Sequence, residues 1–322
     1  MPFLITGAGL VGSQIAHLLV ENGERPHVYD LNPQPDAIQQ IVSLERIQLV
    51  TGDVLDLKAL EEVIRLNGID TIIHTAANVS IVGAQERPHE TIKLNVFGTA
   101  NILELARRLD IKKVVFASST VLYIHRKGGL ESGRLSEDNF PRTTSIYAST
   151  KLACEHLGLN YAEAYGINFV ALRFQAAFGP WTGKGTGDSS NMLRRVIEKT
   201  LKGEEATISS NVMEYVYSKD AARSTLLAAE ARNMKSRVYN VGMGSVYNPG
   251  AIIKIIKERI SSARISVEER SIGKSTITMQ EPVDPNRSKQ EIGYEPQYDM
   301  RKALNDYIDW YEVQMPPLHP IE

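Results

Sequence analysis

Cysteine is almost absent from this chain of 322 residues, since Cys154 is the only one. An intrachain disulfide is therefore impossible. Cys154 stands inside an expected helix with no histidine or aspartate constellation beside it, so we expect a buried structural thiol rather than a nucleophile. Cysteine, histidine and carboxylate residues also form no cluster with metal-ligand spacing, and we expect no metal site.

Long apolar runs and a strong net charge are missing as well. No stretch approaches the length needed to cross a bilayer, and no basic region followed by a cleavable apolar segment is found. The formal net charge is only -2, whereas nucleic acids and acidic membrane surfaces are usually bound by a clustered basic field. We therefore expect a cytoplasmic protein that acts on a small-molecule substrate, with neither nucleic acid nor membrane as a partner.

The composition is that of a globular protein with a full core, with 43% hydrophobic and 23% charged residues. The length exceeds one compact domain, so we expect two lobes. The first half alternates short apolar runs with segments of helical period, which predicts βαβ units and a parallel sheet. We expect its strands at residues 3–5, 27–29, 47–50, 71–74, 114–117 and 168–174.

The pattern changes after Phe178, where glycines and Pro180 crowd one segment and predict a loop. Shorter strands and helices follow, and residues 238–241 look like a strand that returns to the main sheet. We expect an α/β fold whose first lobe, residues 1–178, is a doubly wound parallel Rossmann sheet with a returning strand near 237–242. Residues 179–322 are expected to form a smaller, mixed α/β substrate-binding lobe.

A glycine-rich turn directly follows the first expected strand. Gly7, Gly9 and Gly12 have G-x-G-x-x-G spacing between a strand and a helix, the context in which this pattern indicates a dinucleotide site. The first glycine permits a tight turn, the second lets the backbone approach a pyrophosphate, and the third lets the helix pack on the strand. Leu10 and Val11 complete the turn at the positive end of the helix, which attracts phosphate.

Two carboxylates support this interpretation. Asp30 ends the second expected strand, where a carboxylate can accept hydrogen bonds from both ribose hydroxyls of an adenosine. It would repel a 2′-phosphate and no arginine follows it immediately, so we expect NAD rather than NADP as the cofactor. Asp53, followed by Val54, comes after the third strand and is placed to contact the adenine.

Tyr147 and Lys151 are four residues apart, so a helix places both on one face. A free tyrosine has a pKa near 10, which is too high for a base at neutral pH. A nearby lysine cation would favour the phenolate, and Tyr147 could then exchange a proton with a substrate hydroxyl. Ser119, at the end of the fifth strand, can fix the substrate oxygen. A tyrosine and a lysine at this spacing also occur by chance, so the order of the motifs is what matters.

These residues belong to a longer ordered series of motifs. Besides the glycine turn and Tyr147-x-x-x-Lys151, the series comprises residues 52–53, 74–77, 95–99, 116–123, 172–174 and 178–180. It resembles the extended short-chain dehydrogenases/reductases, the NAD-dependent epimerase/dehydratase group that includes UDP-galactose 4-epimerase, over nearly the whole chain. The resemblance implies an NAD-dependent enzyme in which Ser119 is the catalytic hydroxyl, Thr120 its fallback, and Ala76 and Ala77 bind the cofactor.

The same resemblance suggests where a substrate and a partner would lie. The candidate substrate residues are Asn78, Ser80, Thr120, Gln175 and Trp181. Gln175 and Trp181 lie where substrate is expected but can equally be core or loop packing, and Asn78 and Ser80 can face the nicotinamide instead. Helices 90–109 and 146–165 correspond to those that form a four-helix dimer interface in this family, so we expect a homodimer.

Departures from the family pattern narrow the chemistry. Family dehydratases carry Asp-Glu directly after the catalytic hydroxyl, where this chain has Thr120 and Val121. The glutamate that family decarboxylases need nearby is absent too, so dehydration and decarboxylation are disfavoured. Met213 and Glu214 stand where nucleotide-sugar enzymes carry Arg-Asp, and we expect the glutamate to repel a diphosphate. The arginines that could compensate are Arg194, Arg195 and Arg287.

The sequence therefore predicts an NAD-dependent oxidoreductase that transfers hydride at a secondary alcohol or carbonyl carbon of a sugar, sugar derivative or related hydroxy compound. Tyr147 is the expected acid/base, Lys151 its electrostatic support and ribose anchor, and Ser119 the hydroxyl that holds the substrate. Tyr147 and Lys151 are thus expected to bind the cofactor as well. The alternative is a nucleotide-sugar 4-epimerase that retains its NAD. A non-catalytic NAD sensor is disfavoured because all three residues are present.

Overall fold

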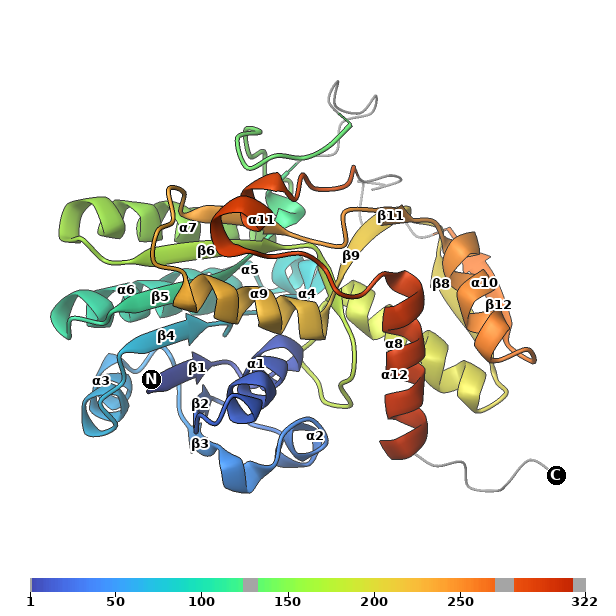
Figure 1. Cartoon of the computed structure of the whole chain (residues 1–322), viewed down its shortest axis with the longest axis horizontal. Coiled ribbons are helices and arrows are strands. Elements are labelled where there is room, and N and C mark those ends of the chain that lie inside the picture. The colour runs from blue at the N-terminus through green and yellow to red at the C-terminus, as the bar shows by residue number, and fades with distance from the viewer. Residues whose placement is uncertain (1, 124–132, 270–280, 315–322) are drawn as a thin grey trace.

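The computed structural model describes residues 2–123, 133–269 and 281–314. Its centre is a seven-stranded sheet in the order β10-β6-β5-β4-β1-β2-β3, in which every neighbouring pair is parallel (Figure 1). The strands are β1 (Phe3–Thr6), β2 (His27–Asp30), β3 (Gln48–Thr51), β4 (Thr71–His74), β5 (Lys113–Ser119), β6 (Phe169–Phe174) and β10 (Val238–Val241). The predicted doubly wound α/β sheet and its returning strand are confirmed.

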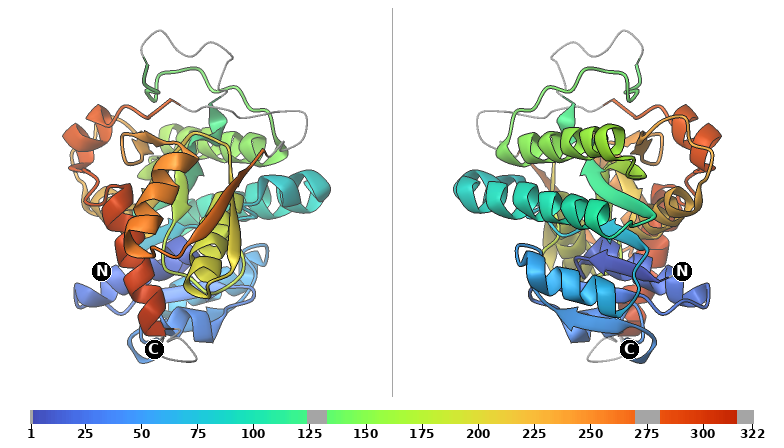
Figure 2. Two further views of the ribbon diagram at one scale, coloured as in Figure 1. Left: turned by 90° about the vertical axis from the view of Figure 1, so that its right-hand side faces the viewer. Right: turned by 90° about the vertical axis from the view of Figure 1, so that its left-hand side faces the viewer.

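Helices cover both faces of this sheet. One face carries α1 (Leu10–Glu21) and α9 (Ser218–Glu230), and the other carries α3 (Leu57–Leu66), α6 (Gly98–Arg108) and α7 (Ile146–Tyr165) (Figures 1 and 2). Neighbouring strand residues serve opposite faces: Ile5 packs on the α1 side, and Leu4 packs on the α3 side. The near-continuous apolar runs of the sequence therefore reflect strands that are buried on both faces.

The strand order changes direction between β1 and β4. The chain moves outward from β1 to β2 and β3, and then returns to build β4, β5 and β6 on the other side of β1. Sheets of this kind bind ligands in the crevice at the carboxyl ends of the strands beside this switch point. The segments that leave β1, β4 and β5 there carry most of the predicted site residues.

The start and the end of helix α7 are each explained by a capping residue. Ser145 caps α7 by accepting a hydrogen bond from the amide of Ala148 at 3.1 Å. Gly166 ends the helix with a φ of 72°, a left-handed conformation that glycine adopts without strain. The helix predicted over residues 90–109 instead consists of α5 (Pro88–Ile92), a π-helical turn η2 (Lys93–Phe97) and α6.

A second hydrophobic core lies beside the carboxyl ends of the main sheet. Its elements are β7 (Ala176–Phe178), α8 (Asp188–Leu201), β8 (Glu205–Ser209), β9 (Met213–Tyr217), β11 (Val246–Tyr247), α10 (Pro249–Arg259), β12 (Arg264–Glu268) and α12 (Met300–Gln314). They form a three-stranded sheet β11-β9-β7 and the pair β12-β8. The smaller mixed α/β region is therefore present, while the domain boundary at residue 178 stays a prediction.

The remaining short elements lacked a sequence signal strong enough to predict them. They are α2 (Pro35–Gln39), η1 (Leu44–Arg46), α4 (Ile81–Glu86), η3 (Thr120–Leu122) and α11 (Asn286–Ile292). Within the described ranges, no helix combines the length and the apolar character that crossing a membrane requires.

One buried ion pair joins α7 to the sheet. Arg173 of β6 donates to Glu155 of α7 through Nε and Nη2, the latter at 2.7 Å, and the two side chains are 6% and 1% exposed. Glu155 also accepts a hydrogen bond from the hydroxyl of Ser118 in β5. Because the carboxylate is fully satisfied and dry, loss of either charge would leave the other buried and unpaired.

We expect Arg173→Met to lower the free energy of unfolding by about 3–5 kcal/mol, because Glu155 would lose its cation in a dry environment. Urea denaturation curves measure this loss. The matched control is Arg259→Met, since Arg259 is 43% exposed and its partner Asp309 is 61% exposed, where such pairs contribute about 0–1 kcal/mol. Equal losses of unfolding free energy in the two variants would contradict the larger contribution proposed for the buried pair.

Candidate active site

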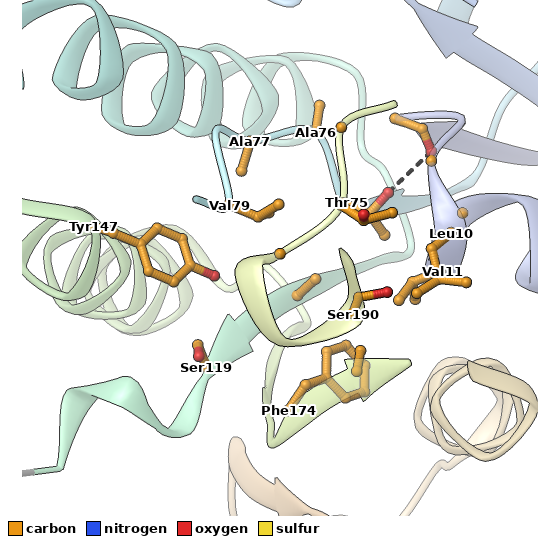
Figure 3. Close-up of a pocket in the computed structure, with 18 of the residues that line it drawn as sticks. Leu10, Val11, Thr75, Ala76, Ala77, Val79, Ser119, Tyr147, Phe174 and Ser190 are labelled. Carbon is orange, nitrogen blue, oxygen red and sulfur yellow. Dashed lines mark hydrogen bonds between the residues drawn. The ribbon is translucent and has the colours of Figure 1, made fainter. Parts of the chain in front are cut away.

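A cavity of about 550 Å³ opens at the carboxyl ends of β1, β2, β4 and β5. All predicted cofactor and catalytic positions line it: Gly7, Gly9, Leu10, Val11, Gly12, Asp30, Asp53, Val54, Ala76, Ala77, Ser119, Tyr147 and Lys151. Figure 3 shows part of this lining, with Leu10 and Val11 on one side and Tyr147 on the opposite side. The fold thus brings residues from six separate segments to one cavity.

The glycines of the β1–α1 turn are required by close backbone approaches. Gly7 has a φ of 95°, and a Cβ there would lie 2.7 Å from the amide nitrogen of Ala76. A Cβ on Gly12 would lie 1.9 Å from the carbonyl oxygen of Gly7. Gly9 differs, because its Cβ would meet only the carbonyl oxygen of Gly185, at 3.8 Å. Gly7 and Gly12 therefore allow the tight backbone of the turn, while Gly9 leaves the surface of the turn open to the cavity.

This turn fits an anionic group. Helix α1 begins at Leu10, and Gly9 at its N-cap offers no side chain to satisfy the first amides. Those amides lie at the positive end of the helix and border the cavity. A dinucleotide pyrophosphate is the kind of ligand that this cradle suits, and a Cβ at Gly9 would occupy the open space.

Asp30 has a second role that its position in the sequence did not reveal. Its Oδ2 accepts a hydrogen bond from the amide of Ala8 at 2.7 Å, and its Oδ1 accepts one from the amide of Asn32 at 2.8 Å. The carboxylate therefore orders the glycine turn while it lines the cavity. Asp53 accepts a hydrogen bond from the amide of Leu55 at 2.9 Å and lines the same end of the cavity.

The three predicted catalytic residues meet at the far end. Ser119 is the last residue of β5, and Tyr147 lies in the first turn of α7. The hydroxyl of Tyr147 points into the cavity, with Ser119 nearby (Figure 3), and hydrogen bonding to Ser119 acts to lower the pKa of Tyr147. Lys151, one helical turn after Tyr147, donates to the carbonyl oxygen of Ala117 at 2.7 Å. Its Nζ lies 4.7 Å from the ring centroid of Phe116 and 5.9 Å from that of Tyr147.

Burial sets the protonation of this pair. It raises the pKa of Tyr147 to about 12, opposed by the hydrogen bond with Ser119. It lowers the pKa of Lys151 to about 8, and Cys154 and Glu155 act in the opposite direction. At neutral pH the tyrosine is therefore neutral and the lysine still carries its charge. Positive charge in addition to that of Lys151 would be needed near the phenol to make Tyr147 a base.

Buried polar residues behind the cavity support the catalytic helix. Asn95, in the π-helical turn, donates to the hydroxyl of Thr150 at 3.0 Å and accepts from the amide of Asn78 at 2.8 Å. Cys154 is fully buried and its thiol donates to the carbonyl oxygen of Asn95, so the predicted structural thiol is confirmed. His74 contacts the hydroxyl of Thr6, and burial lowers its pKa to about 3.

The predicted substrate residues divide into two groups. Thr120 and Gln175 line the cavity, whereas Asn78, Ser80 and Trp181 are outside its lining. Trp181 is 1% exposed and packs in the core of the main sheet. Of the two roles considered for it, substrate contact or core packing, the structure therefore shows core packing. Ser80 instead caps α4 and donates to Asp188 at 3.0 Å.

Glu214 corrects an expectation from the sequence. Its side chain is completely buried and is outside the cavity lining, so it does not face a ligand there as the sequence suggested. The amides of Gly244 and Val283 donate to it. Burial raises the pKa of Glu214 to about 7. Its neighbour Met213 does line the cavity.

None of the three arginines considered as substitutes for the missing diphosphate arginine lines the cavity. Arg194 donates to the carbonyl oxygens of Thr182 and Gly183, and Arg287 pairs with Asp138. Arg195 lines a separate small pocket. Among the described residues of the main cavity lining, the cationic side chains are Lys151 and Lys184.

The segment 184–190 was missed as part of the site. It leads into the first turn of α8 and lines the cavity throughout. Both backbone polar groups of Lys184 bond to the side chain of Gln34, at 2.7 Å and 3.3 Å. The crowded glycines were the available signal, but they indicated only a loop.

Comparisons with known proteins agree with this arrangement. The model of the NAD dependent epimerase/dehydratase family matches residues 3–242. A "Putative UDP-glucose 4-epimerase" of Methanocaldococcus jannaschii is 26% identical over 325 residues, which cover 95% of this chain and 97% of that protein.

Solved structures show the same fold. MoeE5 in complex with UDP-glucuronic acid and NAD has a TM-score of 0.83 and 26% identity, over 98% of this chain and all (100%) of that chain. A partial consensus L-threonine 3-dehydrogenase has a TM-score of 0.86 and 21% identity, over 97% of this chain and 100% of that one. At this lower identity the likeness concerns the fold alone.

We expect Gly9→Ala to fold normally but to weaken NAD binding by at least about tenfold, or ~1.4 kcal/mol, because the new methyl group would occupy the open surface of the turn. Isothermal titration calorimetry with NAD measures the affinity. Gly12→Ala is the matched comparison: it should lower the melting temperature as well, since its Cβ would collide with the backbone. Unchanged NAD affinity in Gly9→Ala would contradict this placement of the pyrophosphate.

Proposed function

The chain belongs to the NAD dependent epimerase/dehydratase family, and from this premise we propose that it transfers hydride at a secondary alcohol or carbonyl carbon of a sugar, sugar derivative or related hydroxy compound. The predictions of the family, of an NAD-dependent enzyme and of NAD as its cofactor are confirmed by the family match. The observation that carries the proposal is the meeting of Ser119, Tyr147 and Lys151 at the end of a cavity that begins at the glycine turn.

In this proposal one end of the cavity binds the cofactor, and the other end binds the substrate and transfers its proton. The glycine turn and α1 would hold the pyrophosphate of NAD, and Asp30 with Asp53 would hold its adenosine end. When bound, NAD supplies the acceptor or donor of hydride. Ser119 and Tyr147 would hold the substrate oxygen between their two hydroxyls, at the opposite end of the cavity.

Tyr147 is the proposed acid/base. In the oxidative direction its phenolate takes the proton of the substrate hydroxyl, and in the reductive direction its hydroxyl returns that proton. Lys151 keeps positive charge beside the phenol ring, and the carbonyl of Ala117 holds the amine in place. The buried position of both side chains excludes water from this proton transfer.

We expect Tyr147→Phe to lower kcat by about 10²–10⁴-fold, the usual contribution of a positioned acid/base, and to leave NAD affinity unchanged. A screen of nicotinamide absorbance over sugars, sugar acids and hydroxy acids provides the assay, and calorimetry gives the affinity. Ser145→Ala serves as a control, because it removes the helix cap without touching the cavity lining. A fully active Tyr147→Phe enzyme would contradict the assignment.

A second candidate is a redox-neutral nucleotide-sugar 4-epimerase. It is favoured by the names of the relatives, such as the putative UDP-glucose 4-epimerase of M. jannaschii. The cavity lining argues against it, because Met213 replaces an arginine and the described lining offers Lys184 as its only cation besides Lys151. Interconversion of UDP-glucose and UDP-galactose without net NADH formation would favour the epimerase; NADH released at each turnover favours the dehydrogenase.

We also propose that two copies associate through the helices 90–109 and 146–165. α6 and α7 lie side by side on one flank of the molecule (Figure 2). Two large apolar side chains of this region are exposed among the described residues: Ile92 is 41% exposed and Phe97 is 62% exposed. Such exposed apolar groups are typical of protein–protein interfaces.

We expect Phe97→Asp to convert a dimer to a monomer, because a charge would be buried in the apolar interface. Sedimentation equilibrium at micromolar concentration measures the mass. Phe140→Asp is the matched control, since Phe140 is 83% exposed and lies outside both helices. A monomeric wild-type protein would contradict the proposed dimer.

A further inference from the structure

Lys184 lies at the end of the cavity that the glycine turn forms. Its neighbour Gly185 borders the turn, because the carbonyl oxygen of Gly185 would lie 3.8 Å from a Cβ on Gly9. Lys184 also lines the cavity beside Gln34, which follows Asp30 by four residues. The backbone of Lys184 is therefore close to the turn that would hold a pyrophosphate and to the segment that would hold a ribose.

Several hydrogen bonds hold this backbone in place. Gln34 accepts from the amide of Lys184 at 2.7 Å and donates to its carbonyl oxygen at 3.3 Å. The indole of Trp181 donates to the same carbonyl oxygen at 3.3 Å, and Arg194 of α8 donates to the carbonyl oxygen of Gly183 at 2.7 Å. Lys184 is exposed, yet the starting point of its side chain is fixed.

The ammonium group of Lys184, in contrast, makes no hydrogen bond or ion pair with the described residues. The other cation of the described cavity lining is Lys151, which donates to the carbonyl oxygen of Ala117 at the end that carries Tyr147. The described lining contains no arginine. Within it, Lys184 is therefore the cation that is available at the cofactor end.

The charges at this end do not suit a dinucleotide unless Lys184 takes part. Asp30 and Asp53 contribute two carboxylates to the lining, and both phosphate groups of a pyrophosphate are negatively charged. The first amides of α1 offset part of this charge, because the end of a helix is equivalent to about half an elementary charge. Bound NAD would otherwise bring like charges together in a partly enclosed cavity, which costs free energy.

We propose that Lys184 binds the pyrophosphate of NAD together with the glycine turn, and that Gln34 positions Lys184 for this contact. The turn supplies backbone N–H donors, and the ammonium group adds a charge-assisted hydrogen bond. This inference rests on the proposed placement of the pyrophosphate at the turn, and it adds a residue that the glycine spacing does not reveal. With Lys184 engaged by the cofactor, the described lining retains Lys151 alone as a cation for the substrate.

Three ligands test the contact in Lys184→Met: NAD, ADP and adenosine. Isothermal titration calorimetry measures each affinity in the wild type and in the variant. We expect NAD and ADP to bind about tenfold more weakly to the variant, or ~1.4 kcal/mol, because a charge-assisted hydrogen bond to the diphosphate is lost. Adenosine has no phosphate, so its affinity should not change. The wild type should also lose NAD affinity more steeply with ionic strength than the variant does.

Further variants separate the charge from its positioning. Lys184→Arg keeps the charge and should retain most of the NAD affinity. Gln34→Leu keeps the charge but removes the hydrogen bonds that position it, and should weaken NAD and ADP while leaving adenosine unchanged. Lys202→Met is the matched control, because Lys202 is exposed at the end of α8 and outside the cavity lining; its affinities should equal those of the wild type.

The outcomes separate this inference from the proposals on which it builds. If Lys184→Met binds NAD as tightly as the wild type, or loses affinity for adenosine equally, the inference is wrong while the glycine turn and hydride transfer stand. A loss confined to NADP would assign Lys184 to a 2′-phosphate and also overturn the inference. If Gln34→Leu weakens adenosine as well, Gln34 binds the nucleoside itself and its positioning role is wrong. A wild type that binds neither NAD nor ADP would overturn the cofactor placement too.

Discussion

The buried ion pair between Glu155 and Arg173 is the constraint on which the active site depends. Glu155 lies one helical turn after Lys151 and two turns after Tyr147, so fixing it against the sheet also fixes both catalytic side chains. The same carboxylate bonds to Ser118, the residue before Ser119. One dry interaction thereby sets the distance between the helix that carries the acid/base and the strand end that carries its hydroxyl partner.

Much of the fold follows from patterns that are local in the sequence. Short apolar runs predicted the strands of the main sheet. The ends of α7 also have local causes, because the capping side chain of Ser145 and the left-handed Gly166 act within a few residues. The π-helical turn at Lys93–Phe97 could not be predicted in this way. Its helical period is nearly that of the flanking helices, and its use, to aim Asn95 at α7, is visible only in three dimensions.

The residues of the site likewise divide into those that local sequence patterns predict and those that only the three-dimensional structure reveals. Residues joined by a fixed spacing, such as the three glycines and the Tyr147–Lys151 pair, were predictable because each spacing has one physical cause. Residues that reach the cavity through long-range packing were not. The segment 184–190 is held at the cavity in part by Gln34, which bonds to Lys184 from 150 residues away. Glu214 looked like a cavity charge, but the amides of Gly244 and Val283 turn it inward.

The electrostatics of the catalytic pair join these observations. In water a tyrosine and a lysine titrate at nearly the same pH, yet burial raises the pKa of Tyr147 to about 12 and lowers that of Lys151 to about 8. Proton loss from Tyr147 therefore needs further positive charge in the cavity, which an oxidised nicotinamide would bring.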